Sequence, residues 1–538
     1  MKTLHVLLLA AIWLAAGTAL AQGLNREIGP DGARHVLNRT GFAASPADIE
    51  QFAKLTRAEA ADKLLRAARR ESVTPPPAWV DEAITPPYKL RDLSPEERMK
   101  ENRLNIERGI ELREWWFREM LDTPSPLTER MTLFWHNHFA TSQQKVRYGQ
   151  LMYRQNLTLR KHALGNFGQL LKDIARDPAM VIYLDSAQNR RGQPNENFAR
   201  EVMELFTLGE GQYSENDIKE VARAFTGWSV DRDNGEFMFR RFAHDGGVKT
   251  VFGRTGRFDG NDVLDMLLER PQTAEFITTK LWKEFVSPTP DMEEVHRLAR
   301  IFRNSRYDIG ALMRAMLTSD AFYAAENRAT LVKSPVEFVV GTLKQFNIET
   351  TYLRPFVFAA AGLGQNVMSP PNVKGWPGGE AWINSSSLLG RKQFLDRVFR
   401  ADDMPMTPAP AEMVAMMRGT AGDVDKAQRR TQAREMQDMR DSADTQKPQP
   451  NDRESRRDRL MQRALEGDAR RGGGLKMDLN KWSAQFRSKS GDATAAMARV
   501  VLPMPPQNPV QPVMMADRSQ EALAQVRQLV ADPTYQLK

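Results

Sequence analysis

The stretch PNENFAREVMELFTLGEGQYSENDIKEVARAFTGW, residues 194–228, predicts two helices joined by a turn. In both halves, apolar residues recur at three- and four-residue spacing, which is typical of a helix with one buried face. Gly209 and Gly211 separate the halves, because glycine readily adopts the left-handed backbone at a helix end. Ser214 is expected to cap the second helix, with Asp217 completing a weak capping box.

Polar residues lie beside the apolar face of the first predicted helix: Asn197, Glu201 and Glu204. Glu201 stands at the border of that face, so packing would partly desolvate its carboxylate. A buried carboxylate needs a partner or a proton. Glu201 and Glu204 are therefore candidate general bases.

Helical periodicity extends in both directions from this stretch and predicts a mainly α protein, with one large multi-helix domain over residues 22–400. One segment departs from it. Asn234-Gly235 lies between two extended runs, which favours a tight hairpin turn, with positive φ at both residues if the turn is type I′. We expect one short β-hairpin that pairs residues 229–233 with residues 236–240.

The first residues predict export. Residues 1–21 combine Lys2, an apolar run and the small-residue site Ala19-Leu20-Ala21, which is the pattern of a signal peptide. No later apolar run is long enough to span a membrane, so we expect a periplasmic or extracellular protein without a transmembrane segment after cleavage. The sequence has no cysteine, which excludes disulfides and zinc–thiolate sites. Its net charge of +8 comes without a basic stripe, which argues against a nucleic-acid partner.

The composition changes sharply after residue 400. No aromatic residue occurs between Phe399 and Trp482, and charged and small residues dominate. Such a segment cannot bury enough apolar surface to offset its chain entropy. Residues 401–474 are therefore predicted to be a disordered or loosely helical linker. Residues 475–538 recover helical pattern and are expected to dock on the core domain, because Trp482 and Phe486 would otherwise be exposed.

Histidine and carboxylate residues outline a hypothetical metal site made of His136, His138, Glu201, His244 and Asp245. Imidazole and carboxylate are ligands for zinc, manganese and iron, so a divalent metal ion is a candidate cofactor. Histidines two apart on a helix diverge by about 200°, however. The alternative is that the histidines are hydrogen-bonded core residues and that the segment at 244–245 is an ordinary turn.

The segment 363–384 combines several glycines and prolines with Trp376 and Trp382. Proline and glycine at this density predict an irregular loop. Its tryptophans have two interpretations: they stack on a sugar or peptide ligand, or they pin the loop to the core.

Several of these segments together resemble the bacterial domain-of-unknown-function family numbered eighteen hundred. The matching segments cover nearly the whole mature chain: LFWHNHFATS (133–142), residues 195–228, HDGGVKTVFG (244–253), LTSDAFY (317–323), KSPVEF (333–338), PPNVKGWPGGEAWIN (370–384) and DPTYQLK (532–538). The resemblance implies an exported protein, in a family whose genes often neighbour those of secreted sulfatase-like proteins. No reaction is established for this family. Many relatives carry histidine where this chain has Phe206, so a ligand at that position would be missing here.

Two classes of function follow. The first is an exported envelope protein that binds or assembles with another secreted protein, the sulfatase-like class being the implied partner. The alternative is a metal-assisted hydrolase of the cell envelope. The positions of the candidate residues discriminate between the two classes, because the hydrolase requires the histidine segments and Glu201 to lie within coordination distance of one another.

Overall fold

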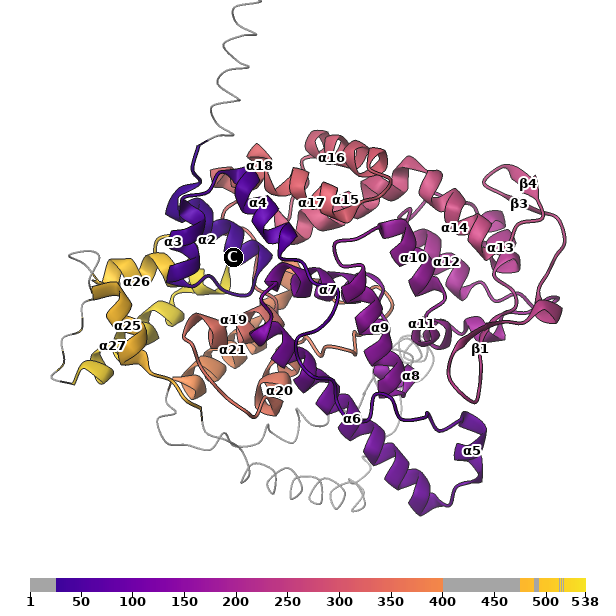
Figure 1. Cartoon of the computed structure of the whole chain (residues 1–538), viewed down its shortest axis with the longest axis horizontal. Helices are drawn as coiled ribbons and strands as arrows, with labels where there is room; N and C mark the ends of the chain where they lie inside the picture. Colours follow the sequence, from indigo (N-terminus) through magenta and orange to yellow (C-terminus); the bar gives the residue numbers. More distant parts are fainter. Residues whose placement is uncertain (1–25, 400–474, 488–492, 512, 514, 516) are drawn as a thin grey trace, which may run out of the picture.

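A computed structural model describes residues 26–399, 475–487, 493–511, 513, 515 and 517–538 (Figure 1). The predicted signal peptide and the predicted linker at 401–474 lie outside the described residues. The described residues are mainly helical, with two small two-stranded sheets, so the predicted fold class is confirmed. No helix within these ranges is long and apolar enough to cross a membrane.

The first half of the chain forms these elements: α2 Gly29–Thr40, α3 Pro46–Ala53, α4 Arg57–Arg66, α5 Pro87–Asp92, α6 Pro95–Asp122, α7 Pro126–His138, α8 Gln143–Val146, α9 Gly149–Lys161, α10 Phe167–Ala175, α11 Pro178–Tyr183, η1 Ser186–Gln188, α12 Asn197–Glu204, α13 Glu215–Ala224, β1 Trp228–Val230, β2 Phe237–Phe239, η2 Arg241–Ala243, β3 Lys249–Val251 and β4 Arg254–Gly256. The second half forms these: α14 Gly260–Glu269, α15 Pro271–Phe285, α16 Met292–Asn304, α17 Ile309–Leu317, α18 Asp320–Tyr323, η3 Ala325–Asn327, α19 Pro335–Gln345, α20 Arg354–Gly362, η4 Gly379–Trp382, α21 Ser385–Val398, α25 Leu479–Arg487, α26 Ala493–Val501, α27 Arg518–Ala531 and η5 Pro533–Gln536.

Local capping chemistry explains where many helices begin. The Ser214 side chain accepts from the Asp217 N–H and the Asp217 carboxylate accepts from the Ser214 N–H, so the predicted capping box at α13 is confirmed. Helix α12 ends earlier than predicted, at Glu204. The chain then turns through Gly209 and Gly211, whose φ angles are +84° and +79°.

Helix α7 lies between two large apolar clusters. Trp135 belongs to the cluster built around α10 to α17, whereas Leu133 belongs to the one built around α6, α19 to α21 and the C-terminal helices. Trp482 on α25 is buried in this second cluster, where its indole N–H donates to the Gln345 carbonyl at 2.8 Å. In Figure 1, α25–α27 lie beside α2 and α3, at the end of the molecule opposite the two sheets.

The first sheet corrects the predicted hairpin. Strands β1 and β2 are antiparallel, with Trp228 opposite Phe239 and Val230 opposite Phe237. The Asp231 N–H donates to the Glu236 carbonyl, so the turn is longer than the two residues predicted. Gly235 has a φ of +73°, but Asn234 does not have a positive φ, so the turn is not type I′.

Strands β3 and β4 form a second hairpin, which the sequence patterns did not predict. Val251 pairs with Arg254, which leaves Phe252 and Gly253 as a two-residue turn with φ angles of +50° and +76°. Positive φ at both positions is the type I′ pattern. A phenylalanine rarely adopts this backbone, so the usual Asn-Gly or Asp-Gly signal is absent from the sequence.

Candidate functional site

The two histidines of α7 are buried and have different partners. His136 Nε2 accepts from the Met368 N–H at 3.0 Å, which requires a neutral ring. Burial, followed by the charge of Arg113, lowers the pKa of His136 to about 3. This histidine therefore acts as a hydrogen-bond acceptor that holds the 363–384 loop.

His138 lies between a carbonyl and an amine. Its Nε2 is 3.2 Å from the Phe206 carbonyl oxygen, which can only accept, so Nε2–H donates and Nδ1 is free to accept from the Lys280 amine at 3.0 Å. Burial and the charge of Lys280 hold the pKa of His138 well below its usual range. Burial also lowers the pKa of Lys280 to about 8. Sequence reasoning missed Lys280, because nothing in its local pattern on α15 distinguishes it.

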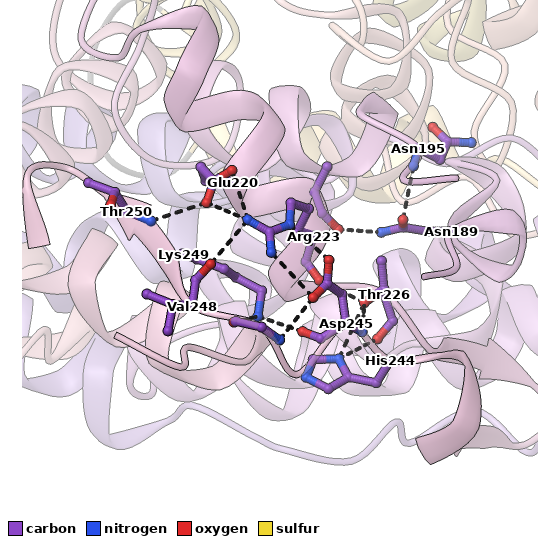
Figure 2. Close-up of polar contacts among 12 residues, drawn as sticks. Asn189, Asn195, Glu220, Arg223, Thr226, His244, Asp245, Val248, Lys249 and Thr250 are labelled. Carbon is purple, nitrogen blue, oxygen red and sulfur yellow. Dashed lines mark hydrogen bonds and ion pairs between the residues drawn. The ribbon is translucent and has the colours of Figure 1, made fainter. Parts of the chain in front are cut away.

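His244 and Asp245 belong to a separate network centred on Arg223 of α13 (Figure 2). Arg223 donates to both Asp245 carboxylate oxygens, at 2.8 and 3.3 Å, and these bonds are the main cause that lowers the pKa of Asp245 to about 2. The Thr226 hydroxyl accepts from the Asp245 N–H at 2.7 Å, and His244 Nδ1 is 2.9 Å from the Thr226 carbonyl oxygen. The network ties the connection after η2 firmly to α13.

The two carboxylates of α12 face the 363–384 loop. The Tyr213 hydroxyl donates to Glu204 at 2.6 Å, and Lys374 lies 4.0 Å from Glu204 and 3.3 Å from Glu210. Burial, followed by the charge of Glu204, raises the pKa of Glu201. Glu204 is thus held by Tyr213 and Lys374 and not by any of the three histidines.

The five predicted metal ligands do not come together. In the part of the chain that the structure describes, no group of three or more histidine, aspartate or glutamate residues is placed to hold a metal ion. His136 contacts Met368 and His138 contacts Phe206, as expected from their divergence on a helix. The structure therefore gives the two histidines of α7 separate partners.

Trp376 and Trp382 are both buried, with 4% and 7% of their surface exposed. The Trp376 N–H donates to Asn137 Oδ1 at 2.7 Å, and Asn137 Nδ2 donates back to the Trp376 carbonyl at 3.3 Å. Neither ring is exposed for stacking on a ligand in this structure. The tryptophans pin the loop to α7 and the core.

Replacing Gly375 by alanine is expected to loosen this attachment. Gly375 has a φ of +81°, and a Cβ atom there would lie 2.2 Å from Asn137 Oδ1 and 2.5 Å from the Asn137 carbonyl oxygen. Backbone strain and overpacking together should lower the free energy of unfolding by about 1–3 kcal/mol. Gly378→Ala is the matched control, because Gly378 has a φ of +71° and no neighbour within 4 Å. Equal losses in urea unfolding of the two variants would contradict a role for the Asn137 contact.

A surface hollow of about 820 Å³ lies next to the Arg223 network. Its walls are residues 187–190, 193–196, 227–229 and 242–243, together with Arg232 and Arg240. Asn189 connects these walls through three hydrogen bonds. Its side-chain N–H donates to the Ala222 carbonyl at 2.8 Å, and its side-chain oxygen accepts from the Asn195 N–H at 2.9 Å. Its backbone carbonyl accepts from the Gly227 N–H at 3.0 Å. The hollow is therefore preformed and rigidly braced.

Arginines dominate the charge of this hollow. Arg190, Arg232 and Arg240 line it, and Glu196 is the acidic residue among its lining residues. Phe242, also at the hollow, has 85% of its surface exposed. Sequence reasoning missed this surface, because its residues come from separate loops and form no local motif.

Comparison with models of known protein families identifies the family to which the chain is related. One family model matches residues 35–537, which is nearly the whole chain, and is described as Protein of unknown function (DUF1800). The chain belongs to this family. The resemblance inferred from the motifs is thereby confirmed. No curated protein and no solved structure matches the chain.

Proposed function

We propose that this family member is an exported protein, periplasmic or extracellular, that binds or assembles with another secreted protein. The observation that carries the proposal is the surface of the hollow, where an 85% exposed Phe242 lies among three arginines. Aromatic residues and arginine are the residue types most enriched among binding hot spots. The resemblance points to a secreted sulfatase-like protein as the partner.

The way Phe242 is held supports a binding role. The Arg240 N–H donates to the Gly227 carbonyl at 2.8 Å and the Ala243 carbonyl accepts from the Arg191 N–H at 2.7 Å, so backbone bonds hold the chain on both sides of Phe242. The bonds of Arg223 to Asp245 hold the following residues. A backbone that is already held in place loses little conformational entropy on binding, which favours affinity.

The metal-assisted hydrolase has less support. His136, His138 and His244 each use a ring nitrogen in a hydrogen bond to the protein's own backbone. Asp245 is bonded to Arg223, so its carboxylate is already neutralised within the fold. These residues are better suited to holding segments together than to coordinating an ion.

The test is binding of the purified mature protein to the secreted sulfatase-like protein of the same genome, measured by biolayer interferometry. Phe242→Ser is expected to weaken binding by about tenfold or more, as for an aromatic hot spot. Leu389→Ser is the matched control, because Leu389 is 57% exposed on α21, away from the hollow. Absence of binding by the wild-type protein, or equal weakening by both variants, would contradict the proposal.

A further inference from the structure

We propose that the 820 Å³ hollow is a receptor for an acidic peptide segment of the partner, whose carboxylates pair with Arg190, Arg232 and Arg240. This inference rests on the proposed function and adds the chemistry of the partner. It is carried by the charge of the hollow, by the pairing of the acidic residues around it and by its size.

Among the residues that the structure describes, the arginines of the hollow have no acidic partner. Within the described ranges, no carboxylate oxygen lies within 4 Å of the guanidinium of Arg232 or Arg240. Arg190 donates to the neutral Gln193 side chain, at 2.6 and 3.1 Å. Guanidinium groups match carboxylates in geometry and bind them with two parallel hydrogen bonds. Such groups along a concave wall create an attractive field for an anion.

Nearby acidic residues make their closest polar contacts with residues other than these three arginines. Glu236 lies 2.7 Å from Arg154, and Asp233 accepts from the Tyr88 hydroxyl at 2.7 Å. Glu196, in the wall of the hollow, lies 3.6 Å from Arg200 on α12. Each of these carboxylates therefore has a partner outside the set of three arginines.

The volume of the hollow limits the size of the ligand that it can hold. Its volume of about 820 Å³ lies within the range of sites that enclose a small molecule or a few peptide residues. A folded surface could not enter it, whereas a short extended segment could.

The exposed ring at the hollow favours a peptide over a sulfated or uronic-acid polysaccharide. Phe242 offers an apolar contact beside the cationic wall. A peptide that contains both acidic and apolar residues matches both features. Aromatic residues and arginine are also enriched in protein–protein interfaces. A highly charged polysaccharide would use the arginines and leave the ring without an apolar partner.

The experiment measures fluorescence anisotropy of a fluorescein-labelled decapeptide of glutamate residues with two interspersed leucines, added to the purified mature protein at low ionic strength. We expect saturable binding that added salt weakens, because counterions screen the pairs. Arg232→Glu and Arg240→Glu should each weaken binding by about tenfold or more. Arg300→Glu, which makes the same charge change on the exposed face of α16, is the matched control and should have little effect.

Three results would overturn the inference: no peptide binding, equal weakening by Arg300→Glu, or binding of a sulfated polysaccharide but not of the peptide. The two proposals fail separately. Phe242-dependent binding of the sulfatase-like protein without peptide binding would contradict only the inference. Arginine-dependent peptide binding without binding of that protein would contradict only the proposed partner.

Discussion

A Glu337→Gln variant is expected to lose about 3–5 kcal/mol of the free energy of unfolding, the cost of breaking a buried ion pair by removing one charge. Glu337, on α19, is 3% exposed and forms ion pairs with Arg130 and Lys538. Its charge also acts on two further buried arginines, Arg39 and Arg391, and on the half-buried Lys333. These residues form a cluster of charged side chains around Glu337. Glu284 contributes the second carboxylate of this cluster, 2.6 Å from Arg130.

The size of this effect follows from desolvation. A glutamine side chain is similar in shape but carries no charge, so the cations around it would lose their main counterion while staying buried. Urea unfolding at neutral pH measures the loss. Glu326→Gln is the control, because Glu326 is exposed in η3. A change in Glu337→Gln no larger than in the control would show that the cluster contributes little to stability.

The same cluster sets one part of the dependence of stability on pH. Burial alone would raise the pKa of Glu337, but the charges of Arg130 and Lys538 outweigh it and hold that pKa below its usual range. A depressed carboxyl pKa stabilises the fold above the pKa of the unfolded carboxyl. The contribution is lost as the pH falls through the lower value of the folded state.

The second large effect expected is a steep loss of stability below about pH 6.5, the usual histidine pKa. His35, His136 and His138 are all buried. Burial, with the charge of Arg39 second, lowers the pKa of His35 to about 3, and the pKa of His136 is also lowered to about 3. The pKa of His138 is lowered well below its usual range.

The sign of this effect follows from proton uptake. Between about pH 6.5 and pH 3 the unfolded chain protonates these histidines while the folded chain does not, so acid favours unfolding. The contribution of these histidines to stability is full above pH 6.5. That contribution should be lower by roughly 4 kcal/mol at pH 5.5, at about 1.4 kcal/mol for each of the three protons. Asp177 offsets part of this loss, because burial raises its pKa to about 7 and the folded state then takes up a proton as the pH falls.

Urea unfolding between pH 5.5 and pH 7.5 checks this expectation. His136→Gln should make the loss at pH 5.5 smaller by about 1.4 kcal/mol, because one of the three histidine protons no longer contributes. His296→Gln is the control, since His296 is exposed on α16, and its slope should match the wild type. A pH dependence of stability that is the same in His136→Gln as in the wild type would contradict the role of the buried histidines.

Local patterns were sufficient for much of the helical architecture. Helix α6 runs from Pro95 to Asp122, and its start depends on the Ser94 capping box. Trp115 and Trp116 on this helix are buried. Caps and apolar periodicity act over three or four residues, so the sequence contains all the information they need. The two hairpins were predicted less well from the sequence than the helices. Turn type depends on backbone angles, and Phe252 adopts its positive φ only within the folded protein.

Only the tertiary structure decided what the polar side chains do. His136 meets Met368, 232 residues away along the chain, and Glu337 meets Lys538, 201 residues away. The sequence by itself determined the fold class, the helix starts, the absence of cysteine and the resemblance to the family, because each is a local or compositional property. The partners of the histidines and the arginine-lined hollow depend on packing between distant segments, and no spacing along the chain encodes that packing.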